Sequence, residues 1–142
     1  MAPESYVLDT SAILTLIENE EGADRVERIL AEERALVPWM TLLEVHYVTL
    51  QEQGQGEADR RYALMKRLSS EILWRIDEPI LLTASRLKAG HHLSLADSLI
   101  AAFAQRESAT LVHKDPEFEV LAEQVKLEAL PYKTAKRPEN QS

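Results

Sequence analysis

Short runs of apolar residues alternate along this chain with longer segments in which apolar residues recur every three or four positions. The short runs predict buried β-strands, and the longer periodic segments predict amphipathic helices. The predicted strands are 5–9, 35–38, 71–76, 109–113 and 125–130, and the predicted helices are 11–20, 23–33, 41–53, 57–70, 79–89, 94–107 and 116–124. Because helices separate the strands, the pattern indicates an α/β fold with a mostly parallel sheet covered by helices on both faces.

The length of the chain and its polar C-terminal end set the expected domain organisation. With 142 residues the chain fits one domain with one core, which we place at residues 1–132. The hydrophobic share of 45% and the charged share of 28% are ordinary for a globular protein. The end of the chain is polar and carries two prolines, Pro131 and Pro138, so we expect residues 133–142 to be a disordered tail.

Composition narrows the environment and the chemistry. No stretch approaches the roughly 20 uninterrupted apolar residues of a membrane span, and the N-terminus lacks the layout of a signal peptide, so a cytoplasmic protein with no membrane partner is expected. The absence of cysteine excludes disulfides and thiolate zinc sites, which leaves oxygen or imidazole to hold any metal. The net charge of −8 argues against a surface that coats nucleic acid, although metal ions would still let an acidic protein act on RNA.

Four acids stand out because they interrupt or adjoin apolar segments. Asp9 ends the first predicted strand and Asp115 lies two residues past the fourth, at the carboxyl edge where open parallel sheets bind ligands. Glu44 and Asp97 lie in the first turns of predicted helices. Each acid also has a purely structural interpretation, because TLLE and SLAD fit the S/T-x-x-D/E capping pattern and the two aspartates at the strand ends precede helices.

Considered together, the four acids favour a metal site over four separate helix caps. Burying a carboxylate costs several kcal/mol unless it is paired or bound to a metal. Two carboxylates about 5 Å apart repel each other by about 3 kcal/mol at an effective dielectric constant of about 20, so a cluster of four needs a compensating cation. Carboxylate oxygens suit Mg²⁺ or Mn²⁺ rather than zinc.

The segments that carry these acids also resemble a known family. YVLDTSAIL, MTLLEVHYV, LSLADSLIAAFA and LVHKDPEF are similar, in order and spacing, to the four acidic motifs of PIN-domain ribonucleases, and most similar to those of the VapC toxins of type II toxin–antitoxin modules. The resemblance runs from about residue 5 to residue 130. It implies a three-layer α/β/α sandwich with a mostly parallel central sheet.

The resemblance further implies a metal-dependent endoribonuclease that hydrolyses RNA phosphodiester bonds, forms a homodimer and is held inactive by a cognate antitoxin. Motif matching assigns Asp9, Glu44, Asp97 and Asp115 as the acids that hold one or two Mg²⁺ or Mn²⁺ ions, and Ser11 as the hydroxyl residue that supports the site. The chemistry implied for such a site is activation of a water for in-line attack and stabilisation of the leaving oxygen.

The fourth motif departs from the family pattern, which commonly has threonine and then a small or polar residue before its aspartate. This chain has His113 and Lys114 at those positions. Lys114 either contacts a scissile phosphate or pairs with a neighbouring carboxylate, and His113 ends the predicted strand. Glu117 is either an additional outer ligand or an exposed glutamate in the first turn of a helix, where the helix dipole favours it.

Basic and aromatic residues suggest partner surfaces less directly. Arg86 and Lys88, shortly before the third motif, are our choice of residues to contact RNA, with solvated helix faces as the alternative. Core packing is the expectation for the large aromatic residues Trp39, Tyr47 and Trp74. The family resemblance also implies a hydrophobic groove for the antitoxin, which the helices predicted at 11–20, 23–33 and 41–53 would form.

Two other functions compete with a ribonuclease. In a non-catalytic PIN-like binding module, the acids would serve only as helix caps and the protein would act through protein or RNA partners. An enzyme with an aspartyl nucleophile after the first strand would usually need a second acid nearby, which the sequence DTSA lacks. Binding of Mn²⁺ separates the binding module from the nuclease.

Overall fold

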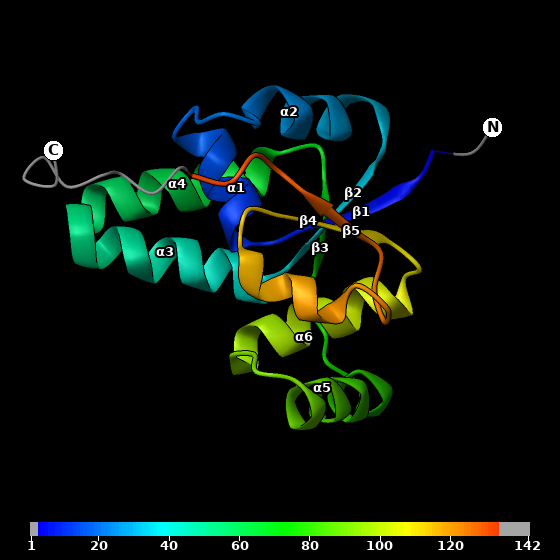
Figure 1. The fold of residues 1–142 in the computed structure, drawn as a ribbon. Helices are drawn as coiled ribbons and strands as arrows, with labels where there is room; N and C mark the ends of the chain where they lie inside the picture. The colour runs from blue at the N-terminus through cyan, green and yellow to red at the C-terminus, as the bar shows by residue number, and fades with distance from the viewer. Residues whose placement is uncertain (1–2, 134–142) are drawn as a thin grey trace, which may run out of the picture.

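A five-stranded parallel sheet lies between two layers of helices in the computed structural model, which describes residues 3–133 (Figure 1). The strands are β1 (Ser5–Leu8), β2 (Arg34–Pro38), β3 (Glu71–Leu73), β4 (Thr110–His113) and β5 (Leu127–Ala129), in the order β3-β2-β1-β4-β5. The helices are α1 (Thr10–Ile17), α2 (Ala23–Glu32), α3 (Trp39–Gln53), α4 (Gln55–Arg67), α5 (Glu78–Gly90), α6 (Leu95–Arg106) and a 3₁₀ helix, η1 (Pro116–Leu121). This architecture confirms the predicted α/β/α sandwich. Except for residue 133, the tail expected to be disordered lies outside the described residues.

The central strands are apolar throughout because both of their faces are buried. In β1, Tyr6 and Leu8 pack under one helical layer, while Val7 between them packs under the other. Since successive side chains of a strand point to opposite faces, a strand covered on both sides needs a continuous apolar run. The same alternation places Leu36 and Leu111 on the side of Val7, in the strands that flank β1.

The two helical layers come from different parts of the chain (Figure 1). Helices α1, α2, α3 and α4 contribute buried residues to the core on one face, and α5, α6 and η1 cover the other face. The α3–α4 hairpin projects beyond the sheet, and Gly54 connects the two helices with a φ of +92°, a conformation that glycine adopts without strain. The hairpin therefore presents surface that the sheet does not cover.

Several predicted elements have other bounds in the structure, and two of these differences have a clear physical consequence. Strand 71–76 is observed only as Glu71–Leu73, because β2 ends at Pro38, opposite Leu73, and leaves the following residues without a neighbouring strand. Helix α3 begins at Trp39, two residues earlier than predicted, and Thr41 lies inside it. The capping interpretation of TLLE is therefore wrong: the buried Thr41 hydroxyl donates to the Leu8 carbonyl at 3.1 Å.

Arg61 joins the two helices of the hairpin from a buried position. Only 7% of the residue is exposed, and its guanidinium donates to Glu57 at 3.0 Å and to the Thr49 hydroxyl at 3.4 Å. Arg61→Ala is expected to lower the free energy of unfolding by about 2–3 kcal/mol, because it leaves a buried hydroxyl unpaired and opens space. Urea denaturation measures this loss.

Arg60 provides the matched control for Arg61. Its side chain is 59% exposed and also contacts Glu57, with donor–acceptor distances of 2.8 and 2.6 Å. Exposed ion pairs contribute little to stability, so Arg60→Ala should leave the urea midpoint nearly unchanged. Equal losses in the two variants would contradict a special role for the buried guanidinium.

Candidate metal centre

The four acids selected from the sequence converge at the carboxyl edge of the sheet. Asp9 follows β1 directly and Asp115 lies two residues past β4; these two strands are paired, and the Asp9 amide donates to the Val112 carbonyl at 3.3 Å. Helices α3 and α6 bring Glu44 and Asp97 to the same place. The edge between β1 and β4 is also where the chain order of the sheet reverses, the position at which open α/β sheets bind ligands.

Asp9 caps helix α1 and belongs to the acidic cluster at the same time. Its Oδ1 accepts the Ala12 amide at 2.8 Å, and the Ser11 hydroxyl lies 2.8 and 2.9 Å from its two carboxylate oxygens. The residue is 3% exposed, and burial raises its pKa to about 7, with the charges of Asp97 and Asp115 contributing in the same direction. The alternatives of cap and ligand are thus not exclusive for this residue.

A second group of carboxylates faces Asp9 from α6 and from the turn after β4. One carboxylate oxygen from each of Asp97, Asp115 and Glu117 lies within 4.8 Å of the others. Burial raises the pKa of Asp97 to about 6, and the neighbouring charges of Glu44, Asp115 and Glu117 add to this effect. Charge interactions through Asp97 therefore link five carboxylates at this edge, one more than the four acids selected from the sequence.

Glu117 is the acid for which the sequence left two interpretations open. It is exposed and lies in the first turn of η1, as one of the alternatives requires. Its amide donates to Asp115 Oδ1 at 3.0 Å, which bends the chain so that both carboxylates face Asp97. The spacing D-P-E was the available signal, because an aspartate side chain readily accepts the amide two residues on, as Asp115 does here from Glu117.

Two hydroxyls beside Asp9 orient the cluster. The Ser11 hydroxyl accepts the Lys114 amide at 2.7 Å while it donates to Asp9, so it joins the turn after β1 to the turn after β4. The Thr10 hydroxyl donates to Glu44 Oε1 at 2.6 Å. Sequence reasoning selected Ser11 and missed Thr10, although the adjacent hydroxyls of the DTS motif pointed to both.

The two residues that depart from the family pattern directly precede Asp115, and both of their side chains are buried. The Lys114 side chain is 5% exposed; its ammonium donates to the Glu21 carbonyl at 2.7 Å and lies 3.7 Å from Glu20. It therefore pairs with a neighbouring carboxylate at the turn between α1 and α2. His113 ends β4 as predicted, and burial lowers its pKa, which keeps the ring neutral near pH 7.

The donor set fits a hard divalent cation. Among residues 3–133, no lysine, arginine or histidine forms an ion pair with any of the five clustered acids. Carboxylates that repel one another in a partly buried site are stabilised when a cation binds between them. Oxygen ligands of this kind suit Mg²⁺ or Mn²⁺.

The two basic residues that we selected as RNA contacts differ in whether their charged groups already bind other atoms of the protein. Lys88 donates to the Leu93 carbonyl at 2.8 Å, which commits its ammonium to the loop that precedes α6. Arg86 is exposed and donates to the hydroxyl of Thr83 on the same helix. Of these two residues, Arg86 is therefore the one whose charged group is not held by a backbone carbonyl.

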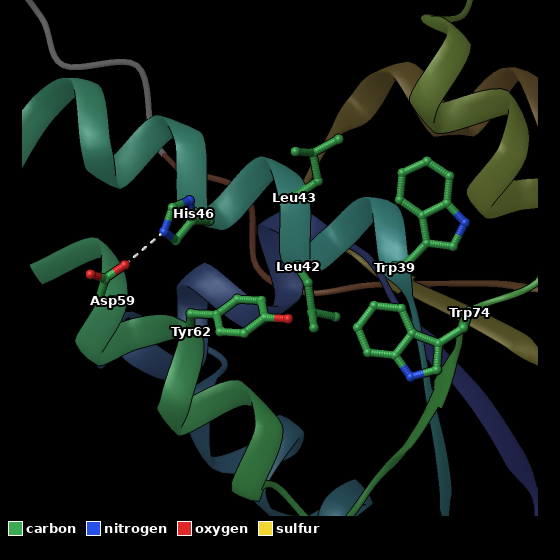
Figure 2. A pocket seen from close by; sticks show the side chains of 7 residues that line it. All are labelled: Trp39, Leu42, Leu43, His46, Asp59, Tyr62 and Trp74. Carbon is green, nitrogen blue, oxygen red and sulfur yellow. Dashed lines mark hydrogen bonds and ion pairs between the residues drawn. The ribbon is translucent and has the colours of Figure 1, made fainter. Parts of the chain in front are cut away.

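A separate apolar pocket lies on the α3–α4 hairpin (Figure 2). The indoles of Trp39 and Trp74 stand at one end, and at the other His46 Nε2 lies 3.1 Å from Asp59. Trp74 is 53% exposed and Tyr47, on α3, is 43% exposed, so the expectation of core packing is wrong for both. Tyr47 lies on the projecting helix α3 and Trp74 directly follows β3, and neither side chain is covered by a second layer of helices.

Comparison with known proteins identifies the family. The PIN domain profile matches residues 6–124. The chain belongs to the PIN domain family. No curated protein matches the sequence. Within residues 3–133, none of the helices combines the length and apolar character that crossing a bilayer requires.

Solved PIN structures share the fold at low sequence identity. The VapBC2 structure from Rickettsia felis, bound to a DNA fragment from their promoter, has a chain with a TM-score of 0.74 and 19% identity, covering 89% of this chain and 99% of that one. VapBC-1 from nontypeable Haemophilus influenzae gives a TM-score of 0.69 at 23% identity, covering 88% and 97%. Mycobacterium tuberculosis VapC20, a sarcin–ricin loop cleaving toxin, gives 0.69 at 16% identity, covering 89% and 99%. This chain therefore has the fold of these toxin–antitoxin proteins.

Proposed function

We propose that this PIN-domain protein is a Mg²⁺- or Mn²⁺-dependent endoribonuclease and the toxin of a type II toxin–antitoxin module. The observation that carries the proposal is the cluster of five carboxylates at the switch point of the sheet, with no basic side chain paired to it among the described residues. The similar fold of a toxin that cleaves the sarcin–ricin loop supports RNA as the substrate class.

In this proposal Asp9, Glu44, Asp97 and Asp115 hold the metal, and Glu117 adds an outer carboxylate. A bound divalent ion supplies an activated water for in-line attack on the phosphodiester and stabilises the leaving oxygen. The protein's own contribution is orientation: Ser11 fixes the rotamer of Asp9, and Thr10 fixes that of Glu44. Because these hydroxyls donate to carboxylates, they leave the remaining oxygen lone pairs available to a cation.

Purified protein tests the proposal with a structured RNA as substrate. Cleavage should require Mg²⁺ or Mn²⁺, stop when EDTA is added, and resume when the metal is restored in excess. Cleavage that continues in EDTA would contradict a carboxylate metal site, and sequencing the RNA ends would define the target.

A non-catalytic binding module is the second candidate, because Asp9 and Asp115 do accept helix N-terminal amides. If capping were their whole role, no cation would be needed between them. Calorimetric titration of the metal-free protein with Mn²⁺ separates the two: saturable binding supports the nuclease, whereas absence of binding supports the module.

The antitoxin is proposed to place an apolar segment in the pocket between α3 and α4. We expected helices 11–20, 23–33 and 41–53 to form the groove, but of these only α3 lines this pocket, together with α4 and Trp74. Exposed aromatic residues that surround a concavity are typical anchors of protein interfaces.

We further propose that the protein forms a homodimer, as the family resemblance implies. Analytical ultracentrifugation tests this by measuring the mass of the purified protein in solution.

Leu43→Glu tests the proposed antitoxin site, because Leu43 lines the pocket and is 53% exposed. The charge should weaken binding to the cognate antitoxin by at least about tenfold, measured by calorimetry. Leu64→Glu is the control: this residue is also exposed on the hairpin but does not line the pocket. Equal binding by the two variants would place the antitoxin elsewhere.

A further inference from the structure

His113 ends β4 with its imidazole enclosed beside the acidic cluster. The residue is 0% exposed, and its ring centroid lies 5.3 Å from that of Phe118 and 6.2 Å from that of Tyr132. Packing against these two rings fixes the plane of the imidazole. The orientation of its two nitrogens is therefore set by the core rather than by solvent.

The two ring nitrogens have different surroundings. Nδ1 accepts the backbone amide of Asp115 at 3.1 Å, which requires Nδ1 to be without a proton. The neutral ring must then carry its proton on Nε2, and this atom is buried with no hydrogen-bond partner among residues 3–133. A buried N–H without a partner is unfavourable, so the ring satisfies Asp115 while one of its own groups stays unsatisfied.

The hydrogen bond from residue 115 back to the side chain of residue 113 has a familiar counterpart. Asparagine, aspartate, serine and threonine form this same contact in Asx and ST turns, where the side chain accepts the amide two residues on. Here an imidazole does so at the turn that presents Asp115. Side chains also bind the amides on either side of it: Ser11 accepts that of Lys114, and Asp115 itself accepts that of Glu117.

We infer that His113 is a positioning residue, which holds the Asp115 carboxylate in place for the metal through the backbone amide of Asp115. The inference rests on the proposed metal-dependent function. It assigns to His113 a contact that any well-placed acceptor would provide. A side chain of similar bulk without an acceptor would still pack against Phe118 and Tyr132, but it would no longer hold the backbone amide of Asp115.

Two substitutions separate these contributions. His113→Asn keeps an acceptor that reaches the amide two residues on, and should bind Mn²⁺ within about threefold of the natural protein. His113→Leu keeps an apolar side chain without an acceptor, and should weaken Mn²⁺ binding at least tenfold, within the range of about 10–100-fold for residues that orient metal ligands. Calorimetry measures both affinities. Phe118→Leu is the control: it loosens the packing of the same ring and should lower the melting temperature while Mn²⁺ affinity is retained.

Nitrogen NMR on the metal-free natural protein tests the hydrogen bond without any variant. The ring should be the Nε2–H tautomer, with Nδ1 showing the shift of an acceptor, and the Asp115 amide should exchange slowly. An Nδ1–H tautomer would overturn the inference even if His113→Leu failed to fold. Equal Mn²⁺ affinity of His113→Leu and the natural protein would overturn it alone, whereas absence of Mn²⁺ binding by the natural protein would overturn the proposed function as well.

Discussion

Asp97→Asn is expected to reduce metal-dependent RNA cleavage by at least about 100-fold while the fold stays intact. Asp97 is the acid whose pKa responds to Glu44, Asp115 and Glu117 together, so it lies among the other carboxylates. Asparagine has nearly the same shape but lacks the charge that attracts a cation. The cap of α6 does not depend on this side chain, because Ser94 accepts the Asp97 backbone amide at 3.1 Å. Cleavage of labelled RNA at saturating Mg²⁺ measures the loss.

Asp24→Asn is the matched control for Asp97→Asn. Asp24 also lies in the first turn of a helix, α2, but it is exposed and outside the acidic cluster. This variant should cleave RNA at the rate of the natural protein. If Asp97→Asn did the same, the carboxylate cluster would not be the catalytic centre.

Removing the charge of Asp9 is expected to stabilise the metal-free protein at alkaline pH. In the folded state burial raises the pKa of Asp9 from 3.8 to about 7, so the folded protein holds this proton more tightly than the unfolded chain does. Stability from this group is therefore fully present below pH 3.8 and is lost as pH rises through about 7. Between pH 5 and pH 8 the loss is roughly 3 kcal/mol.

Asp9→Asn isolates this effect because asparagine is also a good helix cap and does not titrate. In EDTA the variant and the natural protein should unfold at similar urea concentrations at pH 5, and the variant should be more stable at pH 8. Excess Mg²⁺ should reverse the order at pH 8, since a cation stabilises only the protein that has the carboxylate. If the urea midpoints of the two proteins changed equally between pH 5 and pH 8 in EDTA, Asp9 would not be a buried carboxylate without a compensating charge.

The fold was predictable because its strands and helices are visible as different spacings of apolar residues. Tyr6, Val7 and Leu8 form a continuous apolar run only because helices cover both faces of β1. Ends of elements were less predictable, since they depend on neighbours that lie far away in the chain. Strand β3 stops where Pro38 ends β2, a limit set by pairing and not by the residues of β3.

The convergence of the four acids followed from topology, but the details of the cluster did not. Asp9 and Asp115 had to meet because they follow strands that pair in parallel. Glu117 joins them through the tight turn of η1, which periodicity cannot reveal. Likewise, the exposed position of Trp74 depends on where the α3–α4 hairpin leaves the sheet, which is a property of the assembled layers.

The pairing of β1 with β4 has a consequence for the order in which activity arises during synthesis. Asp9 is made at the start of the PIN domain, and its partner acid Asp115 more than a hundred residues later. A nascent chain that ends before β4 has a first strand with one free edge and only part of the acidic cluster. The proposed metal centre is therefore complete only after β4 and the turn that follows it have been made, so any activity that depends on this centre arises late in the synthesis of the domain.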